Sequence, residues 1–450
     1  MEKEIAYEQE TSLKMIYELD DDMSMGKSIV YGLQHLIYFI AGAAVMPVIV
    51  GGYLGLNSAE VASLLQRTFF FCGVLSMLQL QFGHRYPITD GPAGLWIGML
   101  IIMAGSAISA GKSLAMLRAE LELGMMIAGS LIIILAVSGA ISKIARLFTP
   151  IINGIVIVMM VLQISPTIIK GMTGVNETNP TIDPVNLFVF VTTALVILLL
   201  NQFTTGFLRS ISTLVGVCVG WILAFLVGNA PQINHWEGQF ITIPQIFAWG
   251  KPSFDPGIVF TCILASLALF SMVVASITGM GEVVGEKVTP QKLKKSTVIY
   301  GTSAVVAGLF PTVGYMPYVS STGVIAMTRV ASRKPFFFGC LFVMALGFFA
   351  PVGAFFSSMP PAVGYAATLV IFSLIFGQGL KEFQRIPLGN RENYIIGISI
   401  LIGVGVMFLP NTAFSNMPQL MRYILSNGLV DGVLVALFLE NVLLRKKREE

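Results

Sequence analysis

The sequence predicts an all-α polytopic membrane protein whose two halves are inverted repeats of seven segments. Three observations support this fold class. The 450 residues are 55% hydrophobic and 11% charged, with a mean hydropathy of +0.81, whereas soluble domains are about 25% charged. About fourteen apolar stretches approach the length of roughly 20 residues that a membrane helix needs. Two of them, at corresponding positions in the two halves, are too short and too interrupted to cross alone.

The apolar stretches divide the chain into two repeats and an external loop. We expect a cytoplasmic tail at 1–27, a first repeat at 28–228, an external loop at 229–256, a second repeat at 257–443 and a basic cytoplasmic tail at 444–450. Because an odd number of crossings reverses the second copy, seven segments per repeat give an inverted repeat, as in many secondary transporters. The expected spans are 28–51, 59–83, 86–104, 122–142, 147–168, 185–204, 209–228, 257–284, 294–313, 314–329, 335–357, 360–379, 393–409 and 420–443.

The distribution of Lys and Arg predicts that both termini are cytoplasmic. With that orientation, 21 of the 27 basic residues fall on the inner side and Arg67 lies within a span. Cytoplasmic loops carry an excess of positive charge, so this bias supports the orientation and an even number of crossings. The polar, acidic start of the chain does not resemble a signal peptide, so we expect the first apolar segment to be an uncleaved anchor. The external basic residues are Lys112, Arg118, Lys170, Lys251 and Arg422.

The interrupted stretches, residues 86–99 in the third segment and 316–329 in the tenth, form the predicted binding site. Each begins with a Pro-led extended piece, passes through small or polar residues and opens an apolar half-helix. In this comparison Pro87 matches Pro317 and Asp90 matches Ser320. Paired interruptions of this kind indicate the midplane site of a transporter. A half-helix that starts inside the membrane leaves N–H groups unpaired and directs a partial positive charge into the site.

Motifs for enzymatic chemistry are absent from the sequence. It has no nucleophile elbow with a Ser/His/Asp set, no metal-ligand cluster and no phosphate-binding loop, which argues against an enzyme, a cofactor and an ATP-driven pump. The four cysteines stand apart in apolar runs, and we expect them to be buried residues without disulfides or metal. The expected partners are the lipid bilayer and a small-molecule substrate, with no nucleic acid.

Several motifs resemble the nucleobase/ascorbate transporters, also called nucleobase cation symporter-2. They are the Gln34-His35 pair in the first segment, the second segment, the two strand-led half-helices and the motif of segment ten, in which Gly323, Thr328 and Arg329 keep the family spacing. The resemblance covers nearly the whole chain. It implies a core and a gate subdomain, a homodimer, and substrate contacts in segments eight and ten.

The sequence departs from that family at the site itself. Segment ten has Ser320 and Ser321 where the family has Gln, Glu or Pro followed by Asn. Segment eight has Ser276, with Met280 one turn later, where the family has a Glu that grips the base. The usual contacts between carboxylate and base are therefore not available at these positions. In this respect the chain resembles a divergent purine-permease branch with an Asp-Gly-Pro-Ala-Gly-Leu-Trp third segment.

The residues expected to contact substrate belong to the two half-helices and segment eight. Free N–H groups would bind the C=O edges of purine diones, glycines permit close approach, and Trp96 or Tyr318 would stack on a flat base. Ser320 and Ser321 are caps, or caps that also touch substrate. The N–H groups in question are those of Ala93, Gly94, Ser321 and Thr322. The full set is Asp90, Gly91, Ala93, Gly94, Trp96, Ser276, Met280, Tyr318, Ser320, Ser321 and Thr322.

Asp90 is the main candidate for a proton-responsive group, because an ionisable residue near the midplane is a functional candidate by default. The alternative is an N-cap whose carboxylate accepts the first N–H groups of the half-helix. Gln34 and His35 are expected to support the site, with a core role for His35 as the alternative. Glu282, six residues after Ser276 and about 9 Å nearer the cytoplasm, is expected to pair with Lys or Arg before acting as a proton relay.

These patterns favour a multi-pass cell-membrane secondary transporter that imports a purine-type base or oxidised purine, such as xanthine or urate, driven by protons. An anion transporter of the same fold is the alternative, because Ser276 and Ser320 remove negative charge from a site flanked by two helix N-termini. The presence of Asp90 argues against it. A non-transporting receptor or scaffold is disfavoured, because broken helices cost stability without a purpose there. The sequence leaves open which base is carried and whether H⁺ or Na⁺ drives transport.

Overall fold

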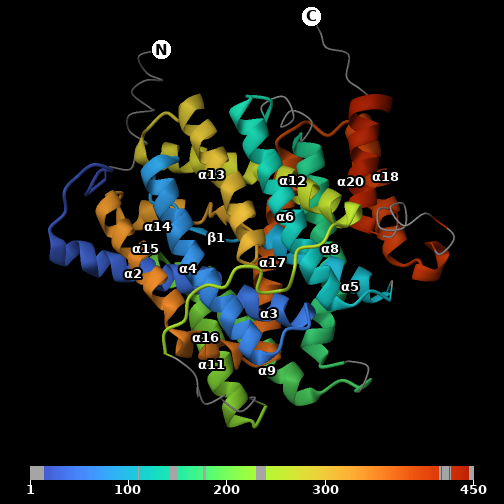
Figure 1. Ribbon diagram of the computed structural model, residues 1–450, viewed down its shortest axis with the longest axis horizontal. Coiled ribbons are helices and arrows are strands. Elements are labelled where there is room, and N and C mark those ends of the chain that lie inside the picture. The colour runs from blue at the N-terminus through green and yellow to red at the C-terminus, as the bar shows by residue number, and fades with distance from the viewer. Residues whose placement is uncertain are drawn as a thin grey trace, which may run out of the picture.

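The computed structural model describes residues 15–109, 111–141, 149–175, 179–229, 240–414, 417, 425 and 427–444. The first 14 residues of the expected N-terminal tail, residues 230–239 of the expected external loop and the basic tail from residue 445 lie outside the described residues. The described chain is helical apart from two short strands and isolated bridges (Figure 1). The predicted helical class and the two predicted strands are therefore present.

Helices overlap every expected span. Seven of them, with α2 and α3 taken together, are long and apolar enough to cross a membrane, so the described chain is that of a multi-pass membrane protein. The strands are β1 (Asp90–Pro92) and β2 (Tyr315–Pro317). The helices are α2 (Met25–Ala43), α3 (Val45–Tyr53), α4 (Ser58–Phe82), α5 (Gly94–Ser109), α6 (Leu114–Val137), α8 (Pro150–Thr173), α9 (Pro184–Phe203), α10 (Gly206–Ser210), α11 (Ser212–Leu226), α12 (Pro256–Val284), α13 (Pro290–Leu309), α14 (Ser321–Thr328), α15 (Arg333–Phe348), α16 (Ala350–Ser357), α17 (Pro361–Gln384), α18 (Asn390–Met407) and α20 (Gly428–Phe438).

Several helices begin where local chemistry requires it. Asp183, Asp255 and Thr289 each accept a hydrogen bond from a backbone N–H of the helix that follows, and each is followed directly by proline. A capping oxygen satisfies an N–H group that lacks a helical acceptor, and proline suits the first turn because it has no N–H to satisfy. Helices α8 and α12 end at Gly174 and Gly285, whose φ angles of 71° and 70° glycine adopts without steric cost.

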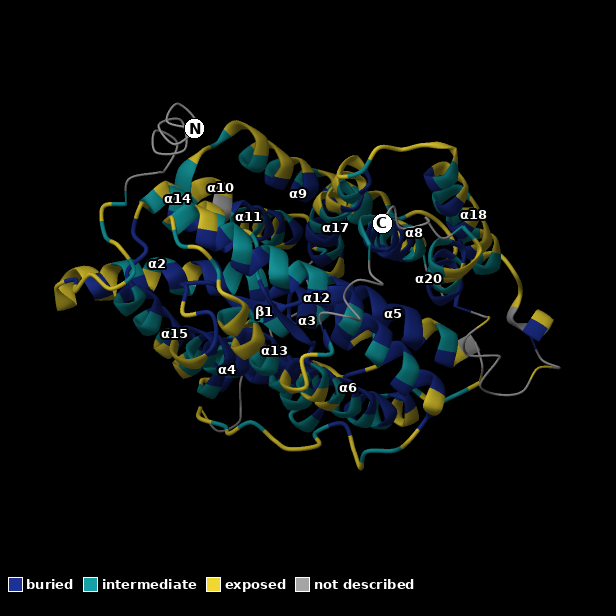
Figure 2. Cartoon of the chain, turned by 90° about the horizontal axis from the view of Figure 1, so that it is seen from above, coloured by how far each residue is buried: buried dark blue, intermediate teal, exposed yellow. Residues whose placement is uncertain are grey.

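The helices pack as two groups. The strand-bearing group contains α2 to α6 and α12 to α16, whereas the flanking group contains α8, α9, α11, α17, α18 and α20. Figure 1 shows α2 and α15 on one side of the molecule and α18 and α20 on the other, with β1 between them. Figure 2 shows buried residues concentrated around β1 and exposed residues toward the periphery. The two groups meet where α5 packs on α8 and where α3 packs on α17.

The packing partners recur with a regular offset. Helix α6 packs on α12 and α13, and α15 packs correspondingly on α2 and α4. In the flanking group, α11 packs on α9 as α20 packs on α18, and α17 packs on α9 as α8 packs on α18. Strand β1 contacts α2 and α4, and β2 contacts α12 and α13. If the helices are numbered by the expected spans that they overlap, the helices of the second pair lie seven spans away from those of the first.

Close approach of α6 and α13 depends on glycine. A Cβ added at Gly129 would lie 2.5 Å from the carbonyl oxygen of Gly301, and one added at Gly301 would lie 2.8 Å from the carbonyl oxygen of Gly129. Backbone cannot move aside as a flexible side chain can. The two helices therefore pack at a distance that only these glycines permit.

We expect Gly129→Val to lower the free energy of unfolding by about 1–3 kcal/mol, because overpacking forces the two backbones apart. The measurement is thermal unfolding of the purified protein in detergent. Gly105→Val is the matched control, since a Cβ at Gly105 meets nothing within 4 Å. Equal destabilisation by both variants would show that the close contact between α6 and α13 is not the cause.

Candidate functional site

Strands β1 and β2 form a two-stranded antiparallel sheet at the centre of the molecule. Just beyond the pair, the Ala93 N–H donates to the carbonyl oxygen of Gly314 and the Tyr318 N–H donates to that of Thr89, each at 2.8 Å. The residue that follows each strand thus donates a backbone hydrogen bond to the residue that precedes the other strand. The register pairs Asp90 with Pro317, Gly91 with Met316 and Pro92 with Tyr315.

This register corrects the sequence comparison of the two stretches. Pro92 and Pro317 each end a strand, and the half-helices begin at Gly94 and Ser321. The match of Pro87 with Pro317, and hence of Asp90 with Ser320, is wrong. The first stretch contains two prolines, Pro87 and Pro92. The sequence comparison matched Pro87 to Pro317, because both start a similar run of residues, but Pro92 is the proline that has the same backbone position as Pro317.

Asp90 is a strand residue and not a helix cap. It is 2% exposed, its N–H donates to the Ser76 hydroxyl on α4 at 2.8 Å, and its Oδ2 has no hydrogen-bond partner among the described residues. Helix α5 begins four residues later, so the interpretation of Asp90 as a cap is wrong. Asp90 is therefore a buried acid directed into the strand-bearing group.

Tyr318 fills the space above Gly91. A Cβ at Gly91 would lie 2.5 Å from the Tyr318 ring, and one at Gly42 would lie 2.7 Å from it. The Tyr318 hydroxyl donates to the carbonyl oxygens of Gly42 and Pro92, at 3.1 and 3.0 Å. Because side chains alternate along a strand, Gly91 and Asp90 face opposite sides of the pair. Tyr318 thus connects the end of α2 to β1 on the side away from Asp90.

Three of the four predicted backbone donors already have partners. The Ala93 N–H donates to Gly314, the Ser321 N–H to the Tyr318 carbonyl at 3.1 Å and the Thr322 N–H to the Val319 carbonyl at 3.0 Å. In α5 the first helical bond is donated by Ile97 to Ala93 at 3.1 Å, so the N–H groups of Gly94, Leu95 and Trp96 precede the helical ladder. The positive end of α5 therefore lies in its first turn, beyond Ala93.

Three predicted contact residues are structural supports in this conformation. Trp96 is fully buried, and its indole packs where a side chain at Gly314 would otherwise lie. Ser276 is fully buried and donates to the carbonyl oxygens of Met272 and Pro317, at 2.9 and 2.8 Å. Met280 is also fully buried. None of the three presents an open face, so the stacking role predicted for Trp96 does not fit this arrangement.

The accessible polar residues gather where α14 begins. Ser320 and Gly323 are exposed and Thr322 is half-buried, whereas Ser321 is buried and accepts a hydrogen bond from the Thr89 N–H at 3.1 Å. The Ser320 and Tyr38 hydroxyls share a hydrogen bond of 2.6 Å, and Thr322 lies beside Gly279 of α12. We call this region, made of Tyr38, Gly279, Ser320, Thr322 and Gly323, the α14 entrance. Sequence reasoning missed Tyr38, although it lies one helical turn after the Gln34-His35 pair.

The predicted supporting residues occupy other places. His35 is buried between α2 and α15, with its Cβ against Gly339 and its ring edge-on to Phe336 at 5.1 Å, so it is a core residue here. Gln34 is half-buried on the same helix. Glu282 is exposed, and among the described residues it forms no ion pair; Glu286 pairs instead with Lys292 at 2.6 Å. The ion pair expected for Glu282 is therefore not present within the part of the chain that the structure describes.

The motif residues of segment ten end the half-helix. The Thr328 hydroxyl donates to the Val324 carbonyl at 3.0 Å, and Arg329 adopts a left-handed conformation with φ of 54°. The Arg329 carbonyl accepts hydrogen bonds from the N–H groups of Ile16 and Tyr17, at 2.8 and 3.2 Å. The spacing from Gly323 to Arg329 thus sets the length of α14 and ties its end to the chain that precedes α2.

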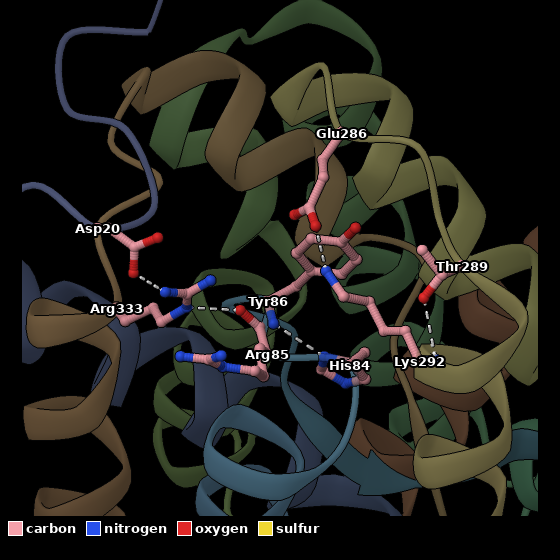
Figure 3. Close-up of polar contacts among 8 residues, drawn as sticks. All are labelled: Asp20, His84, Arg85, Tyr86, Glu286, Thr289, Lys292 and Arg333. Atoms are coloured by element: carbon pink, nitrogen blue, oxygen red, sulfur yellow. Dashed lines mark hydrogen bonds and ion pairs between the residues drawn. The ribbon is translucent and has the colours of Figure 1, made fainter.

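A polar cluster that sequence reasoning missed surrounds the turn between α4 and β1 (Figure 3). The Tyr86 N–H donates to His84 Nδ1 at 3.0 Å, and the Lys292 ammonium lies 4.1 Å from the centre of the Tyr86 ring. Burial, and to a lesser extent the nearby Lys292 ammonium, lower the pKa of His84 to about 3. The His84 ring is therefore neutral near pH 7 and acts here as an acceptor that holds the turn into β1.

This geometry defines a multi-pass membrane protein with discontinuous segments that meet at its centre, the class to which secondary transporters belong. A family model described as a permease family matches residues 26–412. The chain therefore belongs to the nucleobase/ascorbate transporter family of permeases.

Two relatives from Bacillus subtilis (strain 168) cover most of the chain. The protein named "Putative purine permease YwdJ" is 30% identical over 430 residues, which are 94% of this chain and 97% of that protein. The uric acid permease PucJ is 28% identical over 435 residues, which are 94% of each. The chain is thus similar over its length to proteins named for purine and urate transport.

A solved structure shares the fold at low sequence identity. The transmembrane domain of the cyanobacterial bicarbonate transporter BicA superposes with a TM-score of 0.55 at 13% identity, covering 92% of this chain and 96% of that one. At this identity the likeness shows the fold alone.

We expect water-soluble thiol reagents to modify Ser320→Cys at least about tenfold faster than Ser276→Cys, because cysteine reactivity requires access to the thiol. The measurement is the rate of labelling of the membrane-embedded protein. Of the four native cysteines, Cys218 is exposed, contrary to the expected burial, and must be replaced in the background by Cys218→Ser. Equal rates at the two positions would mean that the α14 entrance is not open to water.

Proposed function

We propose that this protein is a secondary transporter that imports a purine-type base or oxidised purine, such as xanthine or urate, by proton symport. The observation that carries the proposal is the central strand pair. On one face it has a buried acid, Asp90, whose Oδ2 has no hydrogen-bond partner among the described residues, and it leads into an accessible polar helix start at Ser320. The names of the relatives support the substrate class. As in those permeases, no enzymatic step is required.

The proposed architecture is fourteen crossings in two inverted repeats of seven. The support is the recurrence of each packing pair seven segments later and the antiparallel strand pair in which each strand contacts equivalent helices. The strand-bearing group corresponds to the core subdomain, and the flanking group to the gate. The excess of Lys and Arg on one side supports cytoplasmic termini in the cell membrane. A homodimer remains part of the proposal through the family resemblance.

The α14 entrance suits a purine-type base with mixed hydrogen-bonding edges. The hydroxyls of Tyr38, Ser320 and Thr322 each donate and accept, so they match adjacent C=O and N–H groups on a purine dione. The N–H groups in the first turn of α5, beginning at Gly94, add donors at a helix N-terminus, where partial positive charge favours carbonyl oxygens. Because positions 276 and 320 are serines and not carboxylates, these hydroxyl and N–H groups would have to orient the substrate.

An anion transporter of the same fold is the second candidate. The shared fold with BicA and the absence of a carboxylate at Ser276 and Ser320 favour it. Against it stands Asp90, a buried acid that repels an anion whenever it is ionised; transport of an anionic purine such as urate therefore requires Asp90 to be protonated, as proton symport would provide. A receptor or scaffold without transport would have no use for the interrupted helices.

Uptake into proteoliposomes with an imposed proton gradient distinguishes these functions. We expect labelled xanthine or urate to accumulate, unlabelled purines to compete and a protonophore to abolish accumulation. Uptake of bicarbonate without uptake of any base would establish the anion carrier instead. A sodium-dependent, proton-independent signal would retain the substrate class and overturn the coupling ion. No uptake from any member of the panel would favour the receptor.

We expect Asp90→Asn to abolish gradient-driven accumulation while exchange at equal concentrations survives, because the amide keeps the shape of the side chain but cannot bind and release a proton. The measurement compares accumulation and exchange across a range of pH. Ser76→Ala is the structural control, since it removes the hydroxyl that holds the Asp90 N–H and leaves the carboxylate in place. An Asn variant with normal, pH-dependent accumulation would transfer the coupling role to Glu282 or to a bound cation.

A further inference from the structure

A groove of about 810 Å³ lies outside the substrate site, where α4 ends and α13 begins. It adjoins the turn into β1 that Figure 3 shows around Arg85 and Tyr86. The residues of its wall that matter here are Phe82, Arg85, Lys294, Lys295, Val298 and Ile299.

The charged part of the groove is entirely basic. Arg85, Lys294 and Lys295 line it, and no acidic residue of the described chain does. The Lys294 ammonium donates to the Val137 carbonyl at the end of α6 at 2.9 Å, which fixes its position. The Arg85 carbonyl accepts from Arg333 Nε at 2.8 Å, and its backbone has φ of 62°, whereas its own guanidinium has no partner among the described residues. The groove therefore presents positive charge that this part of the chain does not neutralise.

The remaining wall is apolar. Phe82, the last residue of α4, is 62% exposed, and Val298 and Ile299 are half-buried between two and three turns into α13. Helix α4 is long and apolar enough to cross a membrane, and α13 overlaps the expected span 294–313, so the apolar wall stands where two expected spans meet the basic residues. A soluble anion would use the basic part of the groove alone. An amphiphile would use both.

We propose that this groove binds an anionic phospholipid, with its phosphate at Arg85 and Lys295 and its acyl chains along Phe82 and α13. Basic pockets at the ends of transmembrane helices recognise lipid headgroups in this way, and Arg is suited to phosphate because its guanidinium donates two parallel hydrogen bonds. The bound lipid would contact the turn that leads into β1. The proposal does not depend on which substrate is carried.

The test is native mass spectrometry of the full-length, delipidated protein titrated with phosphatidylglycerol or phosphatidylcholine. We expect phosphatidylglycerol to bind the wild type preferentially. The variant Arg85→Gln/Lys295→Gln should bind it about 25-fold more weakly, at about fivefold for each charge removed. The control Lys251→Gln/Lys381→Gln removes two exposed cations outside the groove and should leave binding unchanged.

A second arm separates a lipid from a soluble anion. Phe82→Ser should weaken phosphatidylglycerol binding, and added inorganic phosphate should not displace the lipid. The proposal fails if phosphatidylcholine binds as tightly as phosphatidylglycerol, if the double variant keeps wild-type affinity, or if phosphate competes effectively. It also fails if Phe82→Ser has no effect, since the apolar wall would then not be part of the site.

Discussion

The structure depends on the pairing of β1 with β2, because a chain that leaves the helical conformation inside a membrane must satisfy its backbone within the protein. Each unpaired group would cost several kcal/mol. The strand pair, with the flanking bonds of Ala93 and Tyr318, meets this requirement for both interruptions at once. Side chains satisfy two further carbonyls: Ser276 donates to that of Pro317 and Arg67 to that of Pro311. The interruptions are thus stable only as a pair.

The two half-helices are anchored by charge at their far ends. After α5, the Lys112 ammonium pairs with Glu120 and Asp255, and all three side chains are almost fully buried. After α14, Arg333 and Lys334 pair with Asp20 and Asp22, in the chain before α2. Asp255 precedes α12, and Asp20 and Asp22 precede α2. Because α2 and α12 overlap the first expected span of each repeat, the two anchors have corresponding positions in the proposed repeats. The first anchor is buried and the second largely exposed, so only the second is strongly screened by salt.

Composition and periodicity were sufficient to predict the helical membrane class and a short strand in each interrupted stretch, because these features depend on local hydrophobicity and on where helices break. The register of β1 and β2 was not predictable in this way. The first stretch has two prolines, Pro87 and Pro92, and only the structure shows that Pro92 is the one equivalent to Pro317. The burial of individual site residues could not be predicted from the sequence either. Trp96 and Ser276 are suited to ligand contact by residue type, and only the packing of the strands shows that both are enclosed.

The position of Asp90 sets a condition on the proposed coupling. Asp90 and Gly91 face opposite sides of β1, and Tyr318 occupies the Gly91 side. A proton on Asp90 therefore does not need to contact the substrate. Protonation would change the charge beneath β1, whose pairing holds β2 and thus the start of α14. Under the proposed symport, coupling by this route would be carried by the shared strands and would not require a carboxylate at position 276 or 320.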